Sequence, residues 1–262
     1  PMSLPPIKDA SVLAEVDAVV TSLSVSRSER SAHRQLVKLR TFSIQYDKRV
    51  AIGRAGGVPV IISALKKYGE GTAAIAKQGC AVLQNLSSIE GNADSIVLHG
   101  GMEVIVKAME THYRDVSVQE MACAALRNCA SHPLNGGKNR SVIGQAGGVR
   151  VVIGALRRHG KSAKVCDKGV AALGNMCLGS DANRREVGKE GGASAILNAM
   201  RDHDGHEGVC EKGMRTLWDL TKSPMNVELL KCEQGVEDFL LGVGAKFPRR
   251  CKQKALQIFL KL

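Results

Sequence analysis

Aromatic side chains are scarce in this 262-residue sequence: Phe, Trp and Tyr together make up 3%, and Trp218 is the single tryptophan. A core with so few rings must be filled by Ala, Val, Ile, Leu, Met and Cys, which suits closely packed helices. Strands usually bring more Tyr, Phe and Thr. Apolar residues still account for 44% of the chain, so the composition argues against disorder and favours an all-α protein.

The eight cysteines lack the spacing of a disulfide framework or a metal site, because no CxxC pair and no Cys/His cluster occurs. Four of them, Cys80, Cys123, Cys166 and Cys210, lie in apolar helical stretches, where free Cys behaves as a small hydrophobe. We therefore expect reduced core thiols and a reducing, cytoplasmic compartment. Association with a membrane, a cilium, the cytoskeleton or the nucleus stays open.

Long apolar runs are also missing, and none approaches the ~20 residues of a membrane span. The opening PMSLPPIKD has no signal-peptide core. Because a Pro precedes Met2, we do not take residue 1 as the natural start, and a lipid attached there stays open.

Signatures of catalysis are absent: no nucleophile elbow, P-loop or Gly-rich phosphate fingerprint occurs. The stretch RDHDGHEG (residues 201–208) is rich in Asp and His, but a solvated loop explains it better than a metal site does. We expect no enzyme activity, no cofactor and no bound metal.

Short glycine-containing steps recur along the chain as AGGV, HGGM, AGGV, EGGA and EQGV. A repeat of this length is typical of stacked helical units. The longest spacing contains HPLNGG (residues 132–137), which we interpret as an inserted loop. The last glycines of the steps lie 44, 47, 44 and 43 residues apart: Gly57, Gly101, Gly148, Gly192 and Gly235.

A polar residue stands nine positions before each of these glycines. Asn is a favoured N-cap, because its side-chain oxygen accepts a free backbone N–H at the start of a helix. We therefore predict a short helix that begins after this residue and ends at Gly-Gly, where the chain can turn without a Cβ penalty. The residues are Lys48, Asn92, Asn139, Asn183 and Asn226.

Two longer helices are predicted after each glycine step, since segments such as VRVVIGALRRH place apolar residues at helical spacing. The third helices contain KQGCAVLQN, EMACAALRN, DKGVAALGN and EKGMRTLWD. In each of them a Leu stands two residues before an Asn or Asp: Leu83 and Asn85, Leu126 and Asn128, Leu173 and Asn175, Leu217 and Asp219.

This unit resembles the armadillo repeat, and VQEMACAALRNCAS is close to that family's third-helix pattern. HEAT repeats fit less well, because they lack the Gly-Gly step. The resemblance implies an all-α, right-handed armadillo superhelix (an α-solenoid) of about six repeats with incomplete or atypical terminal repeats. We expect FPRRCKQK to give the last repeat a polar outer side, as in a capping repeat. A single domain over residues 1–262 would hold repeats at about 10–45, 46–89, 90–137, 138–180, 181–223 and 224–262.

In armadillo proteins the third helices line a concave groove, and recurring Asn amides there bond the main chain of an extended peptide. The resemblance implies this role for Asn85, Asn128, Asn175 and, as a variant, Asp219. An Asn side chain suits it because it carries both a donor and an acceptor. The alternative is that these amides bond a neighbouring helix and stabilise the stack. Both can hold, because one amide offers several bonds.

The third helices depart from those of importin-α-like proteins, in which a Trp stands four residues before the Asn. Ala81, Ala124, Ala171 and Arg215 occupy these positions, so we do not expect a nuclear-import receptor for basic signals. Trp218 lies beside Asp219. It either anchors a ligand side chain or packs in the core.

Charge indicates which ligand the groove prefers. Residues 1–131 hold 15 Lys and Arg against 12 Asp and Glu, and residues 132–262 hold 22 against 13, which favours acidic partners. This is similar in style to β-catenin, whose basic groove takes acidic extended partners. We expect contacts with acidic ligand residues from Arg127, Lys168, Lys212 and Arg215, with Gln78 beside them.

We therefore predict a non-enzymatic scaffold or adaptor that binds an extended or helical, acidic segment of another protein in this groove. The first alternative is a basic module that docks to a membrane or a cytoskeletal structure, with RRHGKSAK (residues 157–164) as one basic loop. A nucleic-acid-binding solenoid is less favoured, because the aromatic stacking platforms are missing.

Overall fold

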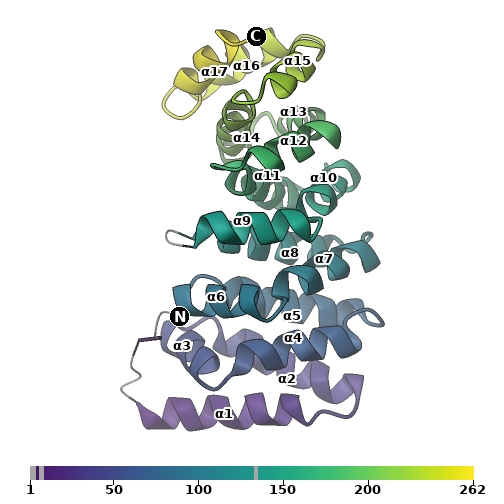
Figure 1. The fold of residues 1–262 in the computed structure, drawn as a ribbon, viewed down its shortest axis with the longest axis vertical. Helices are drawn as coiled ribbons and strands as arrows, with labels where there is room; N and C mark the ends of the chain where they lie inside the picture. The colour runs from purple at the N-terminus through teal and green to yellow at the C-terminus, as the bar shows by residue number, and fades with distance from the viewer. Residues whose placement is uncertain (1–3, 6–8, 133–134) are drawn as a thin grey trace. The chain divides into compact units, whose positions relative to one another are not determined.

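In the computed structural model, the described residues (4–5, 9–132 and 135–262) form seventeen α-helices and no strand (Figure 1). This confirms the all-α prediction. The chain divides into two compact units, Pro1–Val142 and Ile143–Leu262, which are described separately. Two helices are followed by triplets of one short and two longer helices, except that in the last triplet the third helix is as short as the first.

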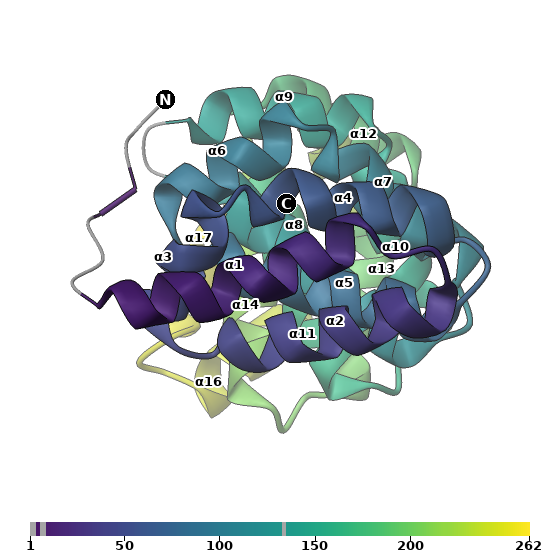
Figure 2. The ribbon, with the colours of Figure 1, turned by 90° about the horizontal axis from the view of Figure 1, so that it is seen from below.

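The first unit begins with a helix pair in which α1 lies alongside α2 and also packs on α3 and α4 (Figure 2). Two triplets follow, and α2, α5 and α8 stack on one another in that order. The bounds are α1 Ala10–Ser24, α2 Glu29–Phe42, α3 Tyr46–Arg54, α4 Gly57–Tyr68, α5 Ala73–Leu86, α6 Glu90–Leu98, α7 Gly101–Thr111 and α8 Val116–Ala130.

The second unit holds the later triplets, in which α14 packs between α11 and α17. Helix α9 (Gly136–Gln145) crosses the boundary between the units and begins inside the predicted loop HPLNGG, of which Pro133 and Leu134 lie outside the described residues. The other bounds are α10 Gly148–Arg158, α11 Ala163–Cys177, α12 Asp181–Lys189, α13 Gly192–Asp202, α14 Glu207–Leu220, α15 Pro224–Lys231, α16 Val236–Lys246 and α17 Lys252–Phe259.

The turn between the first two helices of each triplet depends on a glycine with a left-handed backbone, as predicted. Its φ lies between 62° and 85° at Gly56, Gly100, Gly147, Gly191 and Gly235. The first four of these are the first glycines of GG pairs. Gly235, the single glycine of EQGV, therefore corresponds to Gly191 and not to Gly192, with which the spacing aligned it. The last triplet therefore has one more residue between its buried Asn and its turn.

The asparagines predicted as N-caps lie inside the short helices, so this prediction was wrong. The caps stand three residues earlier, as Ser180 and Ser223 show for α12 and α15. The Asn side chains are buried and donate to backbone carbonyls of preceding helices, so they do not cap their own helices. The bonds run from Asn92 to Arg49 O (3.0 Å), Asn139 to Cys129 O (3.0 Å), Asn183 to Met176 O (2.8 Å) and Asn226 to Arg184 O (3.0 Å).

Three of these amides press on a glycine of the preceding short helix. A Cβ at Gly53 would overlap Asn92 Oδ1, a Cβ at Gly144 would overlap Asn183 Oδ1, and a Cβ at Gly188 would overlap Asn226 Oδ1. A matching contact joins the second helices, where His112 Nε2 bonds Gly69 O (2.5 Å) and His203 Nε2 bonds Gly160 O (2.7 Å). Polar side chains therefore fix the register of neighbouring repeats inside each unit.

The cysteines lie in the core, as expected, except for Cys232, which is exposed. Burial raises the pKa of the thiols of Cys80, Cys129 and Cys177 to about 12. None of the helices in the described part of the chain is long and apolar enough to cross a bilayer.

We expect one fast-reacting thiol per folded chain. The thiolate is the reactive form, so a pKa of about 12 should slow Cys80, Cys129 and Cys177 by about a thousandfold at pH 8 relative to an exposed thiol of ordinary pKa. Burial also raises the pKa of Cys166, Cys210 and Cys251, to about 11, which should slow them by about a hundredfold. Titration with a coloured disulfide reagent should show one thiol at once and the other seven after denaturant is added. In Cys232→Ser the fast phase should vanish, and two or more fast thiols in the folded parent would contradict the buried packing.

Candidate functional site

The predicted site residues lie on the third helices of the triplets, α5 and α8 in the first unit and α11 and α14 in the second. We call the accessible side of these helices the third-helix surface of each unit, and that of the second unit includes α17. Asn85, Asn128 and Asn175 are half-buried on it, whereas Asp219 is buried at 7% exposure. The Leu two residues before each of them has 0% exposure, so it holds the helix to the core and turns the Asn position outward.

Two of the asparagines already bond the preceding helix of the stack. Asn85 Nδ2 donates to Ser43 Oγ at 2.9 Å, and Asn128 Nδ2 donates to Gln84 O at 3.0 Å. Both acceptors lie at the C-terminal end of the preceding helix: Ser43 Oγ is the hydroxyl of the C-cap residue of α2, and Gln84 O is one of the last carbonyls of α5, which have no partner within the helix. The stack-stabilising role that the sequence left open is therefore present in the first unit. Each Nδ2 still has a second hydrogen to offer.

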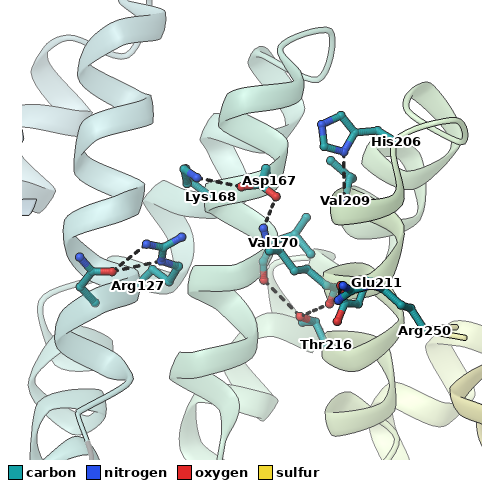
Figure 3. A network of polar contacts seen from close by, with 11 residues as sticks. Arg127, Asp167, Lys168, Val170, His206, Val209, Glu211, Thr216 and Arg250 are labelled. Carbon is teal, nitrogen blue, oxygen red and sulfur yellow. Dashed lines mark hydrogen bonds and ion pairs between the residues drawn. The ribbon is translucent and has the colours of Figure 1, made fainter. Parts of the chain in front are cut away.

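Arg127 and Gln78 make contacts beside this row. The Nε and Nη2 atoms of Arg127 donate to Asn128 Oδ1 at 3.2 and 2.8 Å (Figure 3). Gln78 Oε1 accepts from Arg40 Nη1 at 3.1 Å, which links α5 to α2. The guanidinium thus orients the Asn128 amide, so that its oxygen is occupied and its nitrogen is the group left for other contacts.

Lys168 and Lys212, which we expected to meet an acidic ligand, both bind Asp167 in the second unit. Lys168 Nζ lies 2.9 Å from Asp167 Oδ2, and Lys212 pairs with Asp167 Oδ1 (Figure 3). Burial acts to raise the pKa of Asp167, but hydrogen bonds and charges from Lys212 and Lys168 outweigh it and hold that pKa below its ordinary value. Asp167 directly precedes Lys168 in the sequence, but the sequence does not show that it neutralises these two lysines.

Arg215 and Trp218 lie one helical turn apart on α14. Arg215 is exposed and makes no ion pair among the described contacts. Trp218 is half-buried, and Lys254 Nζ of α17 lies 4.9 Å from the centre of its ring, within cation–π range. Asp219 pairs with Lys222. The sequence did not identify Lys254, because no repeat pattern pairs α14 with α17.

A depression of about 450 Å³ lies at the C-terminal ends of α5 and α8, and Arg127 and Asn128 line it. Sequence reasoning missed its other lining residues, although the pairs Ser-Ser and Ser-His that follow the third-helix patterns were a signal. The buried His132 accepts at Nδ1 from Asn135 N (3.3 Å), and its Nε2 lies 3.4 Å from Glu90 Oε1. The other lining residues are Ser87, Ser88 and Ser131.

Metal-binding geometry is absent from the described residues, which hold no group of three or more His, Cys, Asp and Glu side chains that could share an ion. In RDHDGHEG, His206 Nδ1 accepts from Val209 N at the start of α14 (Figure 3). His203 Nε2 bonds Gly160 O. Both histidines therefore have backbone partners in and around this loop.

No family model matches the sequence. A curated protein, Protein aardvark of Dictyostelium discoideum, is 34% identical over 95 residues, 32% of this chain and 12% of that protein. The chain therefore matches only a small part of this relative's length.

Solved structures match almost the whole chain. An engineered protein aligns with a TM-score of 0.79 at 23% identity, covering 94% of this chain and 96% of its own. A designed armadillo repeat protein in complex with peptide (KR)4 aligns at 0.76 and 17% identity, covering 94% and 99%. A chain from work on a phosphorylation switch between cadherin and beta-catenin aligns at 0.76 and 18%, covering 97% of this chain and 54% of its own. The repeating helix triplets and these alignments together show that the chain has an armadillo-like repeat fold.

Proposed function

We propose that the chain is a non-enzymatic protein-binding scaffold or adaptor, and that its third-helix surface binds an extended or helical segment of a partner. The observation that carries the proposal is the row of half-buried amides at one position of successive third helices, Asn85 and Asn128 in the first unit. An extended segment has unpaired N–H and C=O groups along its length. Asn amides at a regular spacing can bind these main-chain groups whatever the side chains of the segment are.

The solved relatives of this fold support the proposal. One of them is a designed armadillo repeat protein bound to the peptide (KR)4, and another concerns the interaction between cadherin and beta-catenin. These chains share the fold at under 25% identity, so the partner has to be inferred from the residues of this chain.

The charges of the second unit favour an acidic partner. Its acidic side chains on the third-helix surface are already paired, Asp167 with two lysines, Asp219 with Lys222, and Glu211 with Arg250 (Figure 3). Arg215 keeps its charge exposed and unpaired among the described contacts. A basic ligand would find no free carboxylate there, whereas an acidic one would find a guanidinium suited to bidentate binding.

The amide row can be tested with Asn85→Ala combined with Asn128→Ala. Fluorescence anisotropy of a labelled octapeptide of alternating Asp and Glu should show at least tenfold weaker binding, because main-chain bonds to two amides are lost. The exposed Asn198→Ala, on the second helix α13, is the matched control and should leave the affinity unchanged. If the double variant bound the peptide as the parent does but melted at a lower temperature, the two amides would only stabilise the helix stack and the proposed binding role would be wrong.

A basic module that docks to a membrane or a cytoskeletal structure is the alternative. This alternative was suggested by the basic loop RRHGKSAK (residues 157–164), but two of its cations already have partners within the chain. Arg157 donates to Glu190 O, and Lys161 pairs with Asp202 at 2.7 Å. Sedimentation with vesicles of acidic lipid would favour this alternative if the chain bound them at physiological salt. The buried thiols support a reducing, cytoplasmic location as part of the proposal.

A further inference from the structure

Each unit has a depression between two successive second helices, α4 and α7 in the first unit and α10 and α13 in the second (Figure 1). Their volumes are about 240 Å³ and 450 Å³. Both take the same place in the repeat, because Leu65 lines one and Leu156 lines the other, each nine residues after the left-handed glycine of its triplet. We call them the α4–α7 depression and the α10–α13 depression.

The two linings differ in charge. Two lysines and two glutamates line the α4–α7 depression, and Lys107 pairs with Glu70 at 3.7 Å. Two arginines and one aspartate, Asp202, line the α10–α13 depression. Lys161, which stands where the first unit has Glu70, already pairs with Asp202 at 2.7 Å. The arginines of the second unit therefore carry a positive charge that has no counterpart in the balanced lining of the first.

These arginines, Arg157 and Arg201, are positioned by backbone carbonyls. Each stands ten residues after the left-handed glycine of its triplet and donates through Nη2 to the residue that precedes the next such glycine. The acceptors are Glu190 O at 2.5 Å and Gln234 O at 2.9 Å. A carbonyl orients a guanidinium without neutralising it, and the Nε and Nη1 atoms of both arginines make no hydrogen bond among the described contacts.

We propose that the α10–α13 depression binds the carboxylate side chain of a Glu or Asp of another protein. A guanidinium offers a carboxylate two parallel N–H bonds, and the fixed orientation of these two lowers the cost of forming them. The floor is apolar, with Leu156 and Ala199 both 2% exposed, so the methylene groups of a Glu can lie on it. The site is separate from the third-helix surface and does not depend on the proposed function.

The lining favours a carboxylate over a phosphate group. A phosphate monoester carries about 1.5 to 2 negative charges, so Asp202 repels it more than it repels a carboxylate with a single charge. A flat surface of acidic lipid would meet Lys161 first, because the side chain of Lys161 is 90% exposed, and this lysine is the cation that Asp202 already pairs. An acidic protein side chain can instead enter the depression and meet the arginines.

The probe is the blocked tripeptide acetyl-Leu-Glu-Ala-amide, whose only charge is one carboxylate, and its Gln analogue is the uncharged match. In nuclear magnetic resonance titrations of the ¹⁵N-labelled chain, the Glu peptide should shift the backbone amide signals of Gly160 and Ala199. Gly69 and Ala108, which line the α4–α7 depression, should not move. The Gln peptide should bind about tenfold more weakly or less, because the charge-assisted bonds are lost.

Arg157→Gln with Arg201→Gln should weaken binding of the Glu peptide by about tenfold or more. The matched control is Lys66→Gln with Lys107→Gln, which removes the same charge from the α4–α7 depression and should leave the affinity unchanged. Lys161→Glu is a second variant, at an exposed side chain, that touches neither arginine bond. It gives the site the charge that Glu70 has in the first unit and should weaken binding as well, with an unchanged circular dichroism spectrum.

Equal binding of the Glu and Gln peptides, or shifts at Gly69 as large as those at Gly160, would overturn the proposal. Equal losses in the lysine and the arginine double variants would also overturn it, since binding would then follow net charge. A phosphoserine tripeptide that bound tighter than the Glu peptide, or arginine-dependent sedimentation with acidic vesicles, would make this a phosphate site instead. Asn85→Ala with Asn128→Ala should leave the tripeptide affinity unchanged, so a failure of the amide row would be seen separately.

Discussion

Gly188→Ala is expected to lower the free energy of unfolding by about 1–3 kcal/mol, although Ala in a helix is normally favoured over Gly by about 1 kcal/mol. A Cβ at position 188 would overlap Asn226 Oδ1 and the terminal methyl of Met225. The Met side chain can move aside. The Asn side chain cannot, because it has 0% exposure and its Nδ2 donates to Arg184 O at 3.0 Å.

The pairing of Gly188 with Asn226 can be isolated by a double-mutant cycle. Asn226→Ala alone should cost about 1–2 kcal/mol, because a buried hydrogen bond between α15 and α12 is lost. In the double variant the new methyl at position 188 enters space that the amide has left. The combined cost should therefore fall short of the sum by about 1 kcal/mol or more, as measured by urea denaturation followed by circular dichroism.

Gly154→Ala is the matched control for this cycle. Gly154 lies inside α10, and apart from its chain neighbours and the nearby backbone of its own helix no atom lies within 4 Å of a Cβ built there. The substitution should therefore raise the free energy of unfolding by up to about 1 kcal/mol through helix propensity alone. If Gly188→Ala were equally stabilising, or if the two costs at 188 and 226 simply added, the amide would not be pressed on the glycine as the structure has it.

The helix triplets were predictable because their signals are local. A glycine that must adopt a positive φ, such as Gly100 at 76°, marks a turn whatever surrounds it. The spacing of these turns then gives the period, and apolar residues at helical spacing give the elements between them. The alignment of the last turn was off by one residue because EQGV has a single glycine. Only the positive φ of Gly235 shows that it corresponds to the first glycine of the GG pairs and not to the second.

The role of the buried asparagines was not predictable from local signals. Asn92 and Asn226 stand near the start of a short helix, where N-capping is the usual reason for an Asn. Their acceptors, Arg49 O and Arg184 O, are 43 and 42 residues away, one repeat earlier. A local pattern cannot distinguish an Asn that caps its own helix from one that bonds the preceding repeat. The available signal was a glycine 39 residues before Asn92 and 38 residues before Asn226, namely Gly53 and Gly188.

For the candidate site, the sequence located the residues but not their partners. It placed Asn128, Arg127 and Lys168 on third helices, where the structure has them. It treated the cations as free for a ligand, yet Arg127 bonds Asn128 and Lys168 bonds Asp167. Both bonds join residues that are adjacent in sequence, so whether they form depends on the side-chain rotamers, which the sequence pattern does not fix. Arg215 alone among the four predicted cations is exposed and unpaired within the described contacts.

Charge reversal at Arg215 and Lys254 is expected to weaken binding of an acidic octapeptide of alternating Asp and Glu by about tenfold or more. Arg215→Glu removes the exposed guanidinium, and Lys254→Glu removes the cation that lies 4.9 Å from the Trp218 ring. Each change replaces an attraction by a repulsion, and effects of this kind reach a factor of ten when two charges act together. Anisotropy at low and at physiological salt measures it, with Trp218 fluorescence as a second reporter.

Arg185→Glu with Lys189→Glu makes the same change in net charge on the exposed side of α12, a first helix. If a site on the third-helix surface recognises the acid, this control should change the affinity less than about twofold, because exposed charges beyond a screening length of about 8 Å contribute little at physiological salt. The double variant at 215 and 254 should also gain affinity for the peptide (KR)4. Equal losses in both double variants would mean that the acidic peptide responds to the net charge of the chain, and the assignment of Arg215 to a partner-binding surface would fall.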